Sequence, residues 1–255
     1  MGVSLLTYKL DGKRALVTGG ASGIGLATVE LLARSGAAVA INDLPGDRLE
    51  ATAARLCKEG LHVTTAPGDV GQPQSATNMT LQGIAELGGL DYLFNNAGTP
   101  ATRTPIPPSD LDALTEAFWT RILSVNLTSA FWTTKAAVPA LRASSGSIVN
   151  TVSVSAFGGG ASSTAYATAK TGLLGLTREL ARGLAPEVRV NGIAPGLVNS
   201  PWECSFGDLE AQAREFVPLR RVGQPEDYAA VAVYLAVDAR YMTGQVISVD
   251  GGLRL

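Results

Sequence analysis

The sequence predicts one α/β domain over residues 1–255, built on a doubly wound parallel sheet of about seven strands. Three observations lead to this prediction. Short apolar runs of β type alternate with helical stretches, and a glycine-rich turn joins the first run to the first helix. The third is that 255 residues, 46% of them apolar and 16% charged, can bury a sizeable core within one domain. No repeat, low-complexity tract or long linker divides the sequence.

Each expected strand is an apolar run bounded by turn residues. The runs are Arg14–Thr18, Ala38–Asn42, Leu61–Ala66, Leu90–Phe94, Ser147–Thr151, Arg189–Ile193 and Val246–Val249. Strands that alternate with helices form βαβ units and therefore a parallel sheet. The stretch Thr99–Asp110, with four prolines, is expected to be an irregular loop. A long helix is expected from Ser109, an N-cap candidate with Asp112 three residues on.

The turn after the first strand reads Thr18-Gly19-Gly20-Ala21-Ser22-Gly23-Ile24-Gly25. Glycines let backbone N–H groups close around an anion at a helix N-terminus, and the expected anion is a pyrophosphate. The glycine spacing departs from the common Gly-x-Gly-x-x-Gly dinucleotide fingerprint. Taken alone, this stretch is equally typical of a plain structural turn.

Charge and metal-ligand content exclude several classes of function. A net charge of -2 leaves no electrostatic footprint for nucleic acid or an anionic membrane. His62 is the only histidine, and Cys57 and Cys204 lack the spacing of a zinc site, so no metal is expected. Residues 1–14 lack the features of a leader peptide, and the simplest expected location is the cytoplasm.

Acidic residues follow the second and the third expected strand, at the end where open α/β sheets bind ligands. Asp43 comes eighteen residues after Gly25, where a dinucleotide fold places an acid on the adenosine ribose and would repel a 2′-phosphate. The alternative is a solvated turn acid beside Pro45-Gly46. Asp69-Val70 follows the third run. These two residues could contact the adenine or could have no ligand contact, and the sequence favours neither interpretation.

Three motifs occur in one order: the glycine turn, Asn95-Asn96-Ala97-Gly98, and Tyr166-Ala167-Thr168-Ala169-Lys170. Together they resemble the short-chain dehydrogenase/reductase family, and the resemblance runs from Leu10 to Gly252. It implies a Rossmann-type fold and a nicotinamide cofactor. The cofactor-binding residues that it implies are Gly19, Ser22, Gly23, Ile24, Gly25, Asp43, Asp69, Val70, Asn96, Ala97, Gly98, Tyr166, Lys170, Pro195, Gly196, Val198 and Ser200.

The catalytic residues implied by the resemblance are Asn126, Ser153, Tyr166 and Lys170. Asn126 would hold a water in a proton relay; the alternative is a hydrogen-bonded core asparagine. Ser153, thirteen residues before Tyr166, fits the family spacing, with Ser155 as the nearby competitor. Tyr166 and Lys170 are four residues apart and share a helix face, so the ammonium is expected to favour the phenolate.

These residues predict an enzyme that interconverts a secondary alcohol and a ketone, with NAD preferred over NADP because of Asp43. The alternatives are a 3-oxoacyl-[acyl-carrier-protein] reductase-like enzyme and a catalytically inactive dinucleotide-binding protein. Asp43 and the lack of a basic residue at Ser22 count against the former; a sugar-nucleotide epimerase would need a larger substrate region than remains.

The segment 197–219 is implied by the resemblance to be a substrate lid. Its aromatics Trp202, Phe206 and Phe216, together with Phe157, suggest a mostly apolar substrate. Arg103 and Arg214 would also allow the substrate to carry an anionic tail. A homotetramer is also implied, with two long helices, 109–143 and 166–184, pairing across one interface. Small residues at Ala165, Ala169, Gly172 and Gly175 would permit close approach there.

Overall fold

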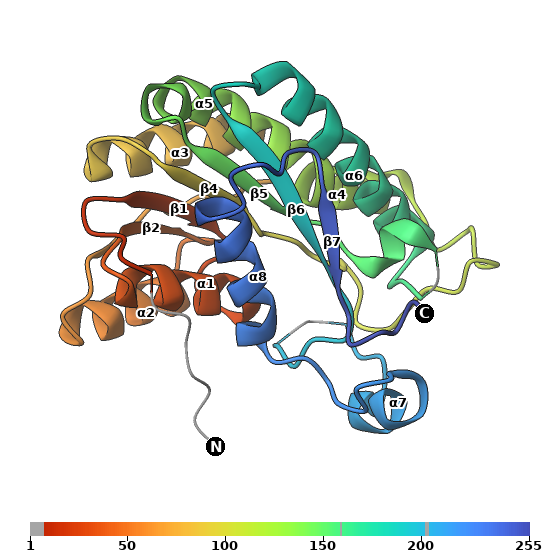
Figure 1. Cartoon of the computed structure of the whole chain (residues 1–255). Coiled ribbons are helices and arrows are strands. Elements are labelled where there is room, and N and C mark those ends of the chain that lie inside the picture. Colours follow the sequence, from red (N-terminus) through yellow and green to blue (C-terminus); the bar gives the residue numbers. More distant parts are fainter. Residues whose placement is uncertain (1–7, 159, 202–203) are drawn as a thin grey trace.

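The computed structural model describes residues 8–158, 160–201 and 204–255, which contain one seven-stranded parallel sheet between two layers of helices (Figure 1). The strand order is β3-β2-β1-β4-β5-β6-β7, so the winding direction changes between β1 and β4. Such a switch point opens a crevice at the carboxyl ends of the strands. The strands are β1 (Arg14–Thr18), β2 (Ala38–Asn42), β3 (Val63–Thr65), β4 (Tyr92–Asn95), β5 (Ser147–Thr151), β6 (Arg189–Pro195) and β7 (Val246–Val249).

The predicted fold class is confirmed, and four of the seven strands have the predicted bounds. β3 is shorter than expected because only three of its residues pair with β2, its one neighbour. β4 continues to Asn95, which pairs with Asn150 of β5. β6 continues through Pro195, since Ala194 and Pro195 still pair with β7.

Helices cover both faces of the sheet, as the layers in Figure 1 show. Leu16 and Val17 are both fully buried and belong to different core clusters, because neighbouring side chains of a strand point to opposite faces. Burial of both faces explains the continuous apolar runs. One layer holds α1 (Gly23–Arg34), α2 (Asp47–Lys58) and α8 (Pro225–Val237); the other holds α3 (Pro73–Leu87), α5 (Ser129–Ser144) and α6 (Thr164–Leu184).

The predicted helix start at Ser109 is wrong. Residues 107–114 form successive turns, in which the carbonyl of Pro107 accepts the N–H of Asp110. The helix α4 (Glu116–Leu123) begins after Thr115, whose hydroxyl accepts the Phe118 N–H at 3.2 Å. A π-helical segment, η1 (Ser124–Thr128), then joins α4 to α5.

The small residues on α6 lie differently from the expectation. Ala165 and Ala169 are fully buried in a cluster with Ile122 of α4, and a Cβ on Gly172 would come 2.9 Å from Leu127 of η1. Ala165, Ala169 and Gly172 therefore permit close packing of α6 on its own chain, whereas Gly175 is exposed and a Cβ there would meet no atom within 4 Å.

Two short elements complete the site-bearing edge: η2 (Val154–Phe157), a 3₁₀ turn after β5, and α7 (Leu209–Phe216). In the part of the chain that the structure describes, no helix has the length and hydropathy needed to cross a bilayer.

Candidate active site

The glycine turn after β1 has a shape that only glycine allows at several positions. Gly19 and Gly23 have φ of +63° and +52°. A Cβ on Gly25 would lie 2.1 Å from the carbonyl oxygen of Gly19. Ser22, the N-cap of α1, makes no capping bond through its side chain, and the first turn carries no acidic residue. This uncapped helix start with closely approaching backbone fits a pyrophosphate.

Asn96 joins the carboxyl ends of three strands. Its Nδ2 donates to the carbonyls of Thr18 (3.1 Å) and Gly19 (3.3 Å), and its Oδ1 accepts the Thr151 hydroxyl at 3.3 Å. The Thr18 hydroxyl accepts the N–H groups of Asn96 (2.9 Å) and Ala97 (3.0 Å). Asn96 therefore fixes the glycine turn to β4 and β5, and its side-chain amide is already hydrogen-bonded to other residues of the protein.

The loop after β6 closes over the glycine turn. Ser200 Cβ lies 3.2 Å from the position a Cβ on Gly23 would take. Val198 forms an isolated parallel bridge with Gly223, and a Cβ on Gly196 would come 2.8 Å from Asp250 Cβ. The expected cofactor residues of β1, β4 and β6 thus lie around one crevice at the switch point.

Asp43 is buried at the end of β2, and its carboxylate is largely occupied. Oδ1 accepts the Leu44 N–H at 2.9 Å and Arg48 Nη2 at 2.7 Å, while Oδ2 accepts the Ala21 N–H at 3.1 Å. Arg48, which was not predicted to contact Asp43, is the second residue of α2. Because each oxygen accepts about two hydrogen bonds, the open position is on Oδ2.

Asp69 and Val70 are also held by protein contacts. Asp69 accepts Arg121 Nη1 at 2.9 Å and the Gly71 N–H at 2.8 Å. Val70 is buried against Met79 and Val125.

Tyr166 and Lys170 share one face of α6, as predicted. The Ser163 hydroxyl caps this helix by accepting the Tyr166 N–H at 3.1 Å. Lys170 Nζ lies 5.6 Å from the centre of the Tyr166 ring and donates to the Thr151 carbonyl at 2.8 Å. The side chains of Ser153 and Tyr166 are hydrogen-bonded to each other. Helix α6 and the end of β5 thereby bring the three predicted groups together.

The pKa of Tyr166 is raised overall in this structure, although Lys170 lies beside the ring. Burial raises the pKa of Tyr166 to about 12, and the hydrogen bond from Ser153 acts in the lowering direction. Burial also lowers the pKa of Lys170 to about 7. The physical reason is that removal from water disfavours the charged form of both groups.

Asn126 is buried in η1, and its side chain ties the helix to the loop after β4. Nδ2 donates to the carbonyls of Thr99 (2.9 Å) and Ile122 (3.0 Å), and Oδ1 accepts the Thr99 N–H at 3.1 Å. Both amide hydrogens are therefore occupied. A water held here would be bound mainly through the main chain of the π-helical turn, where the ordinary helical ladder is interrupted.

The lid region contacts the loop over residues 99–110. The N–H of Ser205 donates to the Arg103 carbonyl at 2.9 Å. The same loop is also bonded outside the lid, because the N–H of Ile106 donates to the carbonyl of Ser162, just before α6, at 2.9 Å. Cys204 is buried, whereas Phe216 is 60% exposed and does not seal the lid to the body. Trp202 lies outside the described residues.

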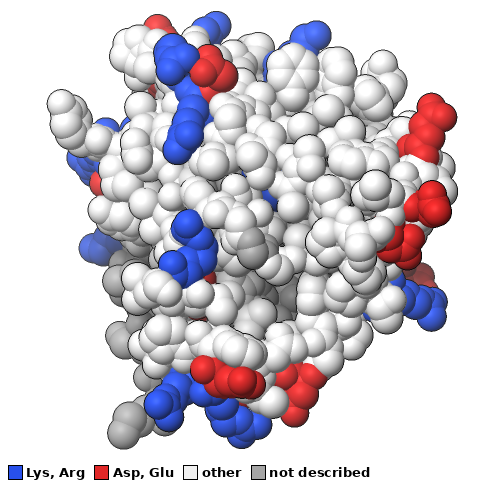
Figure 2. All heavy atoms as spheres, turned by 90° about the vertical axis from the view of Figure 1, so that its right-hand side faces the viewer, with Lys and Arg blue, Asp and Glu red and all other residues white. Residues whose placement is uncertain are grey.

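Figure 2 shows the side of the molecule to which the carboxyl ends of the strands point. Most of the charged side chains in this view lie toward the rim, basic side chains also lie to the left of the centre, and the described surface around the central hollow is otherwise uncharged. This distribution suits a substrate of low charge.

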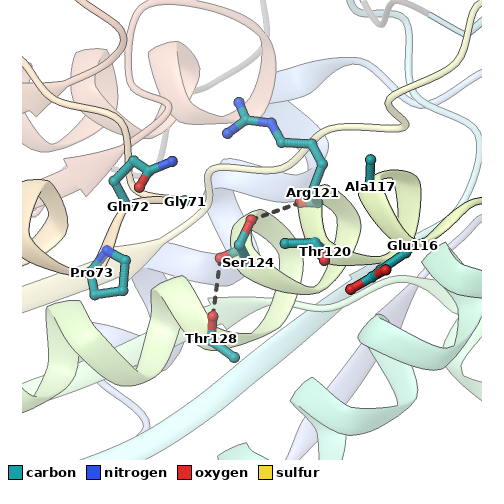
Figure 3. A pocket seen from close by; sticks show the side chains of 9 residues that line it. All are labelled: Gly71, Gln72, Pro73, Glu116, Ala117, Thr120, Arg121, Ser124 and Thr128. Carbon is teal, nitrogen blue, oxygen red and sulfur yellow. Dashed lines mark hydrogen bonds between the residues drawn. The ribbon is translucent and has the colours of Figure 1, made fainter.

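A second hollow, of about 700 Å³, lies on the outer side of α4 and η1 near the start of α3 (Figure 3). Arg121, Ser124 and Thr128 line it, and none of the predicted catalytic residues does. It is therefore separate from the site described here. Among the described residues, no group of three or more His, Cys, Asp or Glu side chains could hold a metal ion.

Sequence reasoning missed Arg48, Thr18 and Thr151, and weighed Ser155 only as a rival of Ser153. For Thr18 and Thr151 a signal existed, because each is the last residue of a predicted strand. Nothing in the spacing of Asp43 and Arg48 pointed to their ion pair.

The chain is similar over most of its length to proteins of known family. A family model described as Enoyl-(Acyl carrier protein) reductase matches residues 19–254. The "Granaticin polyketide synthase putative ketoacyl reductase 2" of Streptomyces violaceoruber is 41% identical, covering 94% of this chain and 96% of the relative. The 3-oxoacyl-[acyl-carrier-protein] reductase FabG of Chlamydia pneumoniae is 38% identical, covering 96% and 98%.

Solved structures agree with this similarity. A short-chain dehydrogenase from Burkholderia cenocepacia J2315 in complex with NADP has a TM-score of 0.87 at 32% identity, covering 97% of this chain and 100% of that chain. A 7α-hydroxysteroid dehydrogenase complexed with NADH and 7-oxo glycochenodeoxycholic acid also has a TM-score of 0.87, at 29% identity, covering 99% and 98%.

Proposed function

Because the chain belongs to the short-chain dehydrogenase/reductase family and is an NAD(P)-dependent oxidoreductase acting on CH–OH groups, we propose that Ser153, Tyr166 and Lys170 carry its proton chemistry. The observation that supports this assignment is their convergence beside the glycine turn. Ser153 bonds Tyr166, and Lys170 lies 5.6 Å from the Tyr166 ring centre.

A nicotinamide cofactor held by the glycine turn after β1 and the loop after β6 would supply the hydride acceptor for alcohol oxidation and the hydride donor for ketone reduction. In oxidation, the Tyr166 phenolate takes the proton from the substrate hydroxyl as the carbonyl forms. Ser153 donates a hydrogen bond to the same oxygen, and Lys170 with the main chain at Asn126 connects Tyr166 to solvent. In ketone reduction Tyr166 gives the proton back.

The pH dependence should follow the protonation of Tyr166. Oxidation needs the phenolate, the minority form below a raised pKa, so its rate should rise with pH and level off only above the apparent pKa of the site. Reduction needs the phenol, so its rate should instead fall as the pH rises through the same apparent pKa. Steady-state rates in both directions measure this, and Lys170→Met should move the oxidation limb to higher pH. Oxidation that slows as pH rises would contradict the assignment.

NAD is proposed to be preferred over NADP, supported by the buried Asp43 carboxylate at the end of β2. Solved neighbours of the chain are complexed with NADH and with NADP, so the family admits both. Arg48 qualifies the preference, because its guanidinium neutralises Asp43 and could pair with a 2′-phosphate.

Arg48→Gln should raise the ratio of kcat/KM for NAD over NADP by roughly tenfold, since it frees Asp43 and removes the cation. Asp43→Ala should lower the same ratio. Arg55→Gln, which removes an arginine of α2 that pairs with Glu30 and Glu59, is the matched control and should leave the ratio unchanged. A wild-type enzyme that uses NADP(H) more efficiently than NAD(H) would refute the role of Asp43.

The substrate is proposed to be a mostly apolar alcohol or ketone, bound under a lid formed by residues 197–219. The largely uncharged centre of the face in Figure 2 supports this proposal. A second candidate is an acyl-carrier-protein-linked 3-oxoacyl thioester, favoured by relatives that are named as ketoacyl reductases.

An assay of secondary alcohols, ketones and 3-oxoacyl thioesters decides between these substrates. Turnover is measured by the absorbance of the nicotinamide cofactor, with the NAD and NADP couples tested separately. No turnover of any member, with cofactor binding intact, would favour the catalytically inactive alternative. Activity confined to small, highly charged hydroxy acids would refute an apolar substrate.

We also propose a single domain over residues 1–255, a homotetramer and a cytoplasmic location. The tetramer is supported mainly by the family, because three of the four small residues of α6, Ala165, Ala169 and Gly172, pack within the chain. Light scattering at micromolar concentration measures the assembly.

A further inference from the structure

Two serines meet at the start of η2. Ser153 is the N-cap of this turn, and its Oγ accepts the backbone N–H of Ser155 at 3.2 Å. The same Oγ accepts the Ser155 hydroxyl at 2.9 Å. Ser155 is 4% exposed, whereas Ser153 is partly exposed at the crevice.

These contacts determine which way the Ser153 hydroxyl points. A serine oxygen has two acceptor positions and one proton to donate. The two Ser155 donors fill both acceptor positions, so Ser153 is left with its proton. If Ser153 instead donated to the Ser155 oxygen, the Ser155 hydroxyl proton would be buried with no acceptor among the described residues, which is unfavourable.

We propose that Ser155 is a positioning residue: it makes Ser153 a hydrogen-bond donor only, whose single proton is directed at the Tyr166 oxygen or, when substrate is bound, at the substrate oxygen. This inference rests on the proposed function of Ser153 and Tyr166. A donor at that oxygen stabilises the negative charge that forms on it during the reaction.

Among the described residues, few titratable groups face Tyr166, so the pH dependence of the reaction can report on its protonation. Lys170 faces the ring from the same helix. On the other side, α4 and η1 contribute the apolar side chains Ile122 and Leu127 to its cluster. From η2 the contact is Ser153. Among the described residues, Lys170 is therefore the titratable group to consider beside the serine pair.

The test is the pH profile of Ser155→Ala in the full chain. Loss of the Ser155 hydroxyl frees an acceptor position on Ser153 Oγ, which can then accept a hydrogen bond from the Tyr166 hydroxyl and so favour the phenol. The oxidation limb should then move up by about one pH unit, and kcat/KM for oxidation at pH 8 should fall about tenfold. Ser155→Thr, which keeps the hydroxyl, should restore the limb. Ser147→Ala is the matched control, because Ser147 is a buried serine of β5 that donates to the Ala236 carbonyl, and it should not move the limb.

A double-mutant cycle separates positioning from general stability. In a Ser153→Ala background, Ser155→Ala should cause no further shift, because the oxygen that it acts on is absent. A wild-type pH limb in Ser155→Ala, or a full second shift in that background, overturns the proposal. Near-normal turnover of Tyr166→Phe would instead refute the proposed function itself.

Discussion

Tyr166→Phe should lower turnover in both directions by about 10²- to 10⁴-fold, the range typical of a lost general acid or base. The change removes the hydroxyl that bonds Ser153 and keeps the ring that packs beside Ala165 and Ile122. Cofactor affinity should therefore stay nearly unchanged. Steady-state rates together with a cofactor titration measure the two effects separately.

Tyr92→Phe is the matched control for this variant. Tyr92 is a buried tyrosine of β4 in the cluster formed with α1 and α8, outside the predicted site. Its loss of a hydroxyl should leave turnover within about twofold of wild type, as for most changes away from functional groups. Retention of near-normal activity by Tyr166→Phe would mean that the proton comes from another group.

Gly25→Ala should weaken cofactor binding by about 10- to 100-fold, the value of one charge-assisted hydrogen bond. Its Cβ would lie 2.1 Å from the Gly19 carbonyl oxygen and 2.6 Å from Asn96 Nδ2, so the turn must open. We expect the free energy of unfolding to fall by about 1–3 kcal/mol, as for other overpacked sites. Cofactor titration and denaturant unfolding measure the two changes.

Gly183→Ala is the corresponding control. Gly183 lies in α6, and a Cβ there would meet no atom within 4 Å. Alanine is the better helix former, so this variant should be neutral or more stable by up to about 1 kcal/mol. If Gly25→Ala bound cofactor as tightly as Gly183→Ala, the pyrophosphate would not lie on this turn.

The sheet was predictable because its signal is local and repeated. Each central strand is buried on both faces, so it appears in the sequence as an unbroken apolar run. The order of the motifs then placed Ser153, Tyr166 and Lys170 at one edge. The start of α4 was not predictable from Ser109, because nearby prolines and Asp110 favour turns over a helix.

The features of the site that could not be predicted from the sequence depend on side-chain geometry. Arg48 reaches Asp43 only because α2 begins at Asp47 and places it one turn away. The direction of the Ser155 hydrogen bond depends on burial, which spacing does not encode. The pKa of Tyr166 likewise depends on how completely α4 and α6 exclude water from it.

The bonds that Asn96 makes with Thr18 join residues 78 apart in sequence. By contrast, β1 pairs with β2 across about a third of that separation, Arg14 lying opposite Ala38. Contacts between distant residues pay a larger loop-closure entropy and are slower to form than local ones. A refolding chain can therefore form its first βαβ unit, β1-α1-β2, before it forms the crevice. Recovery of cofactor binding would then report when the two halves of the sheet join.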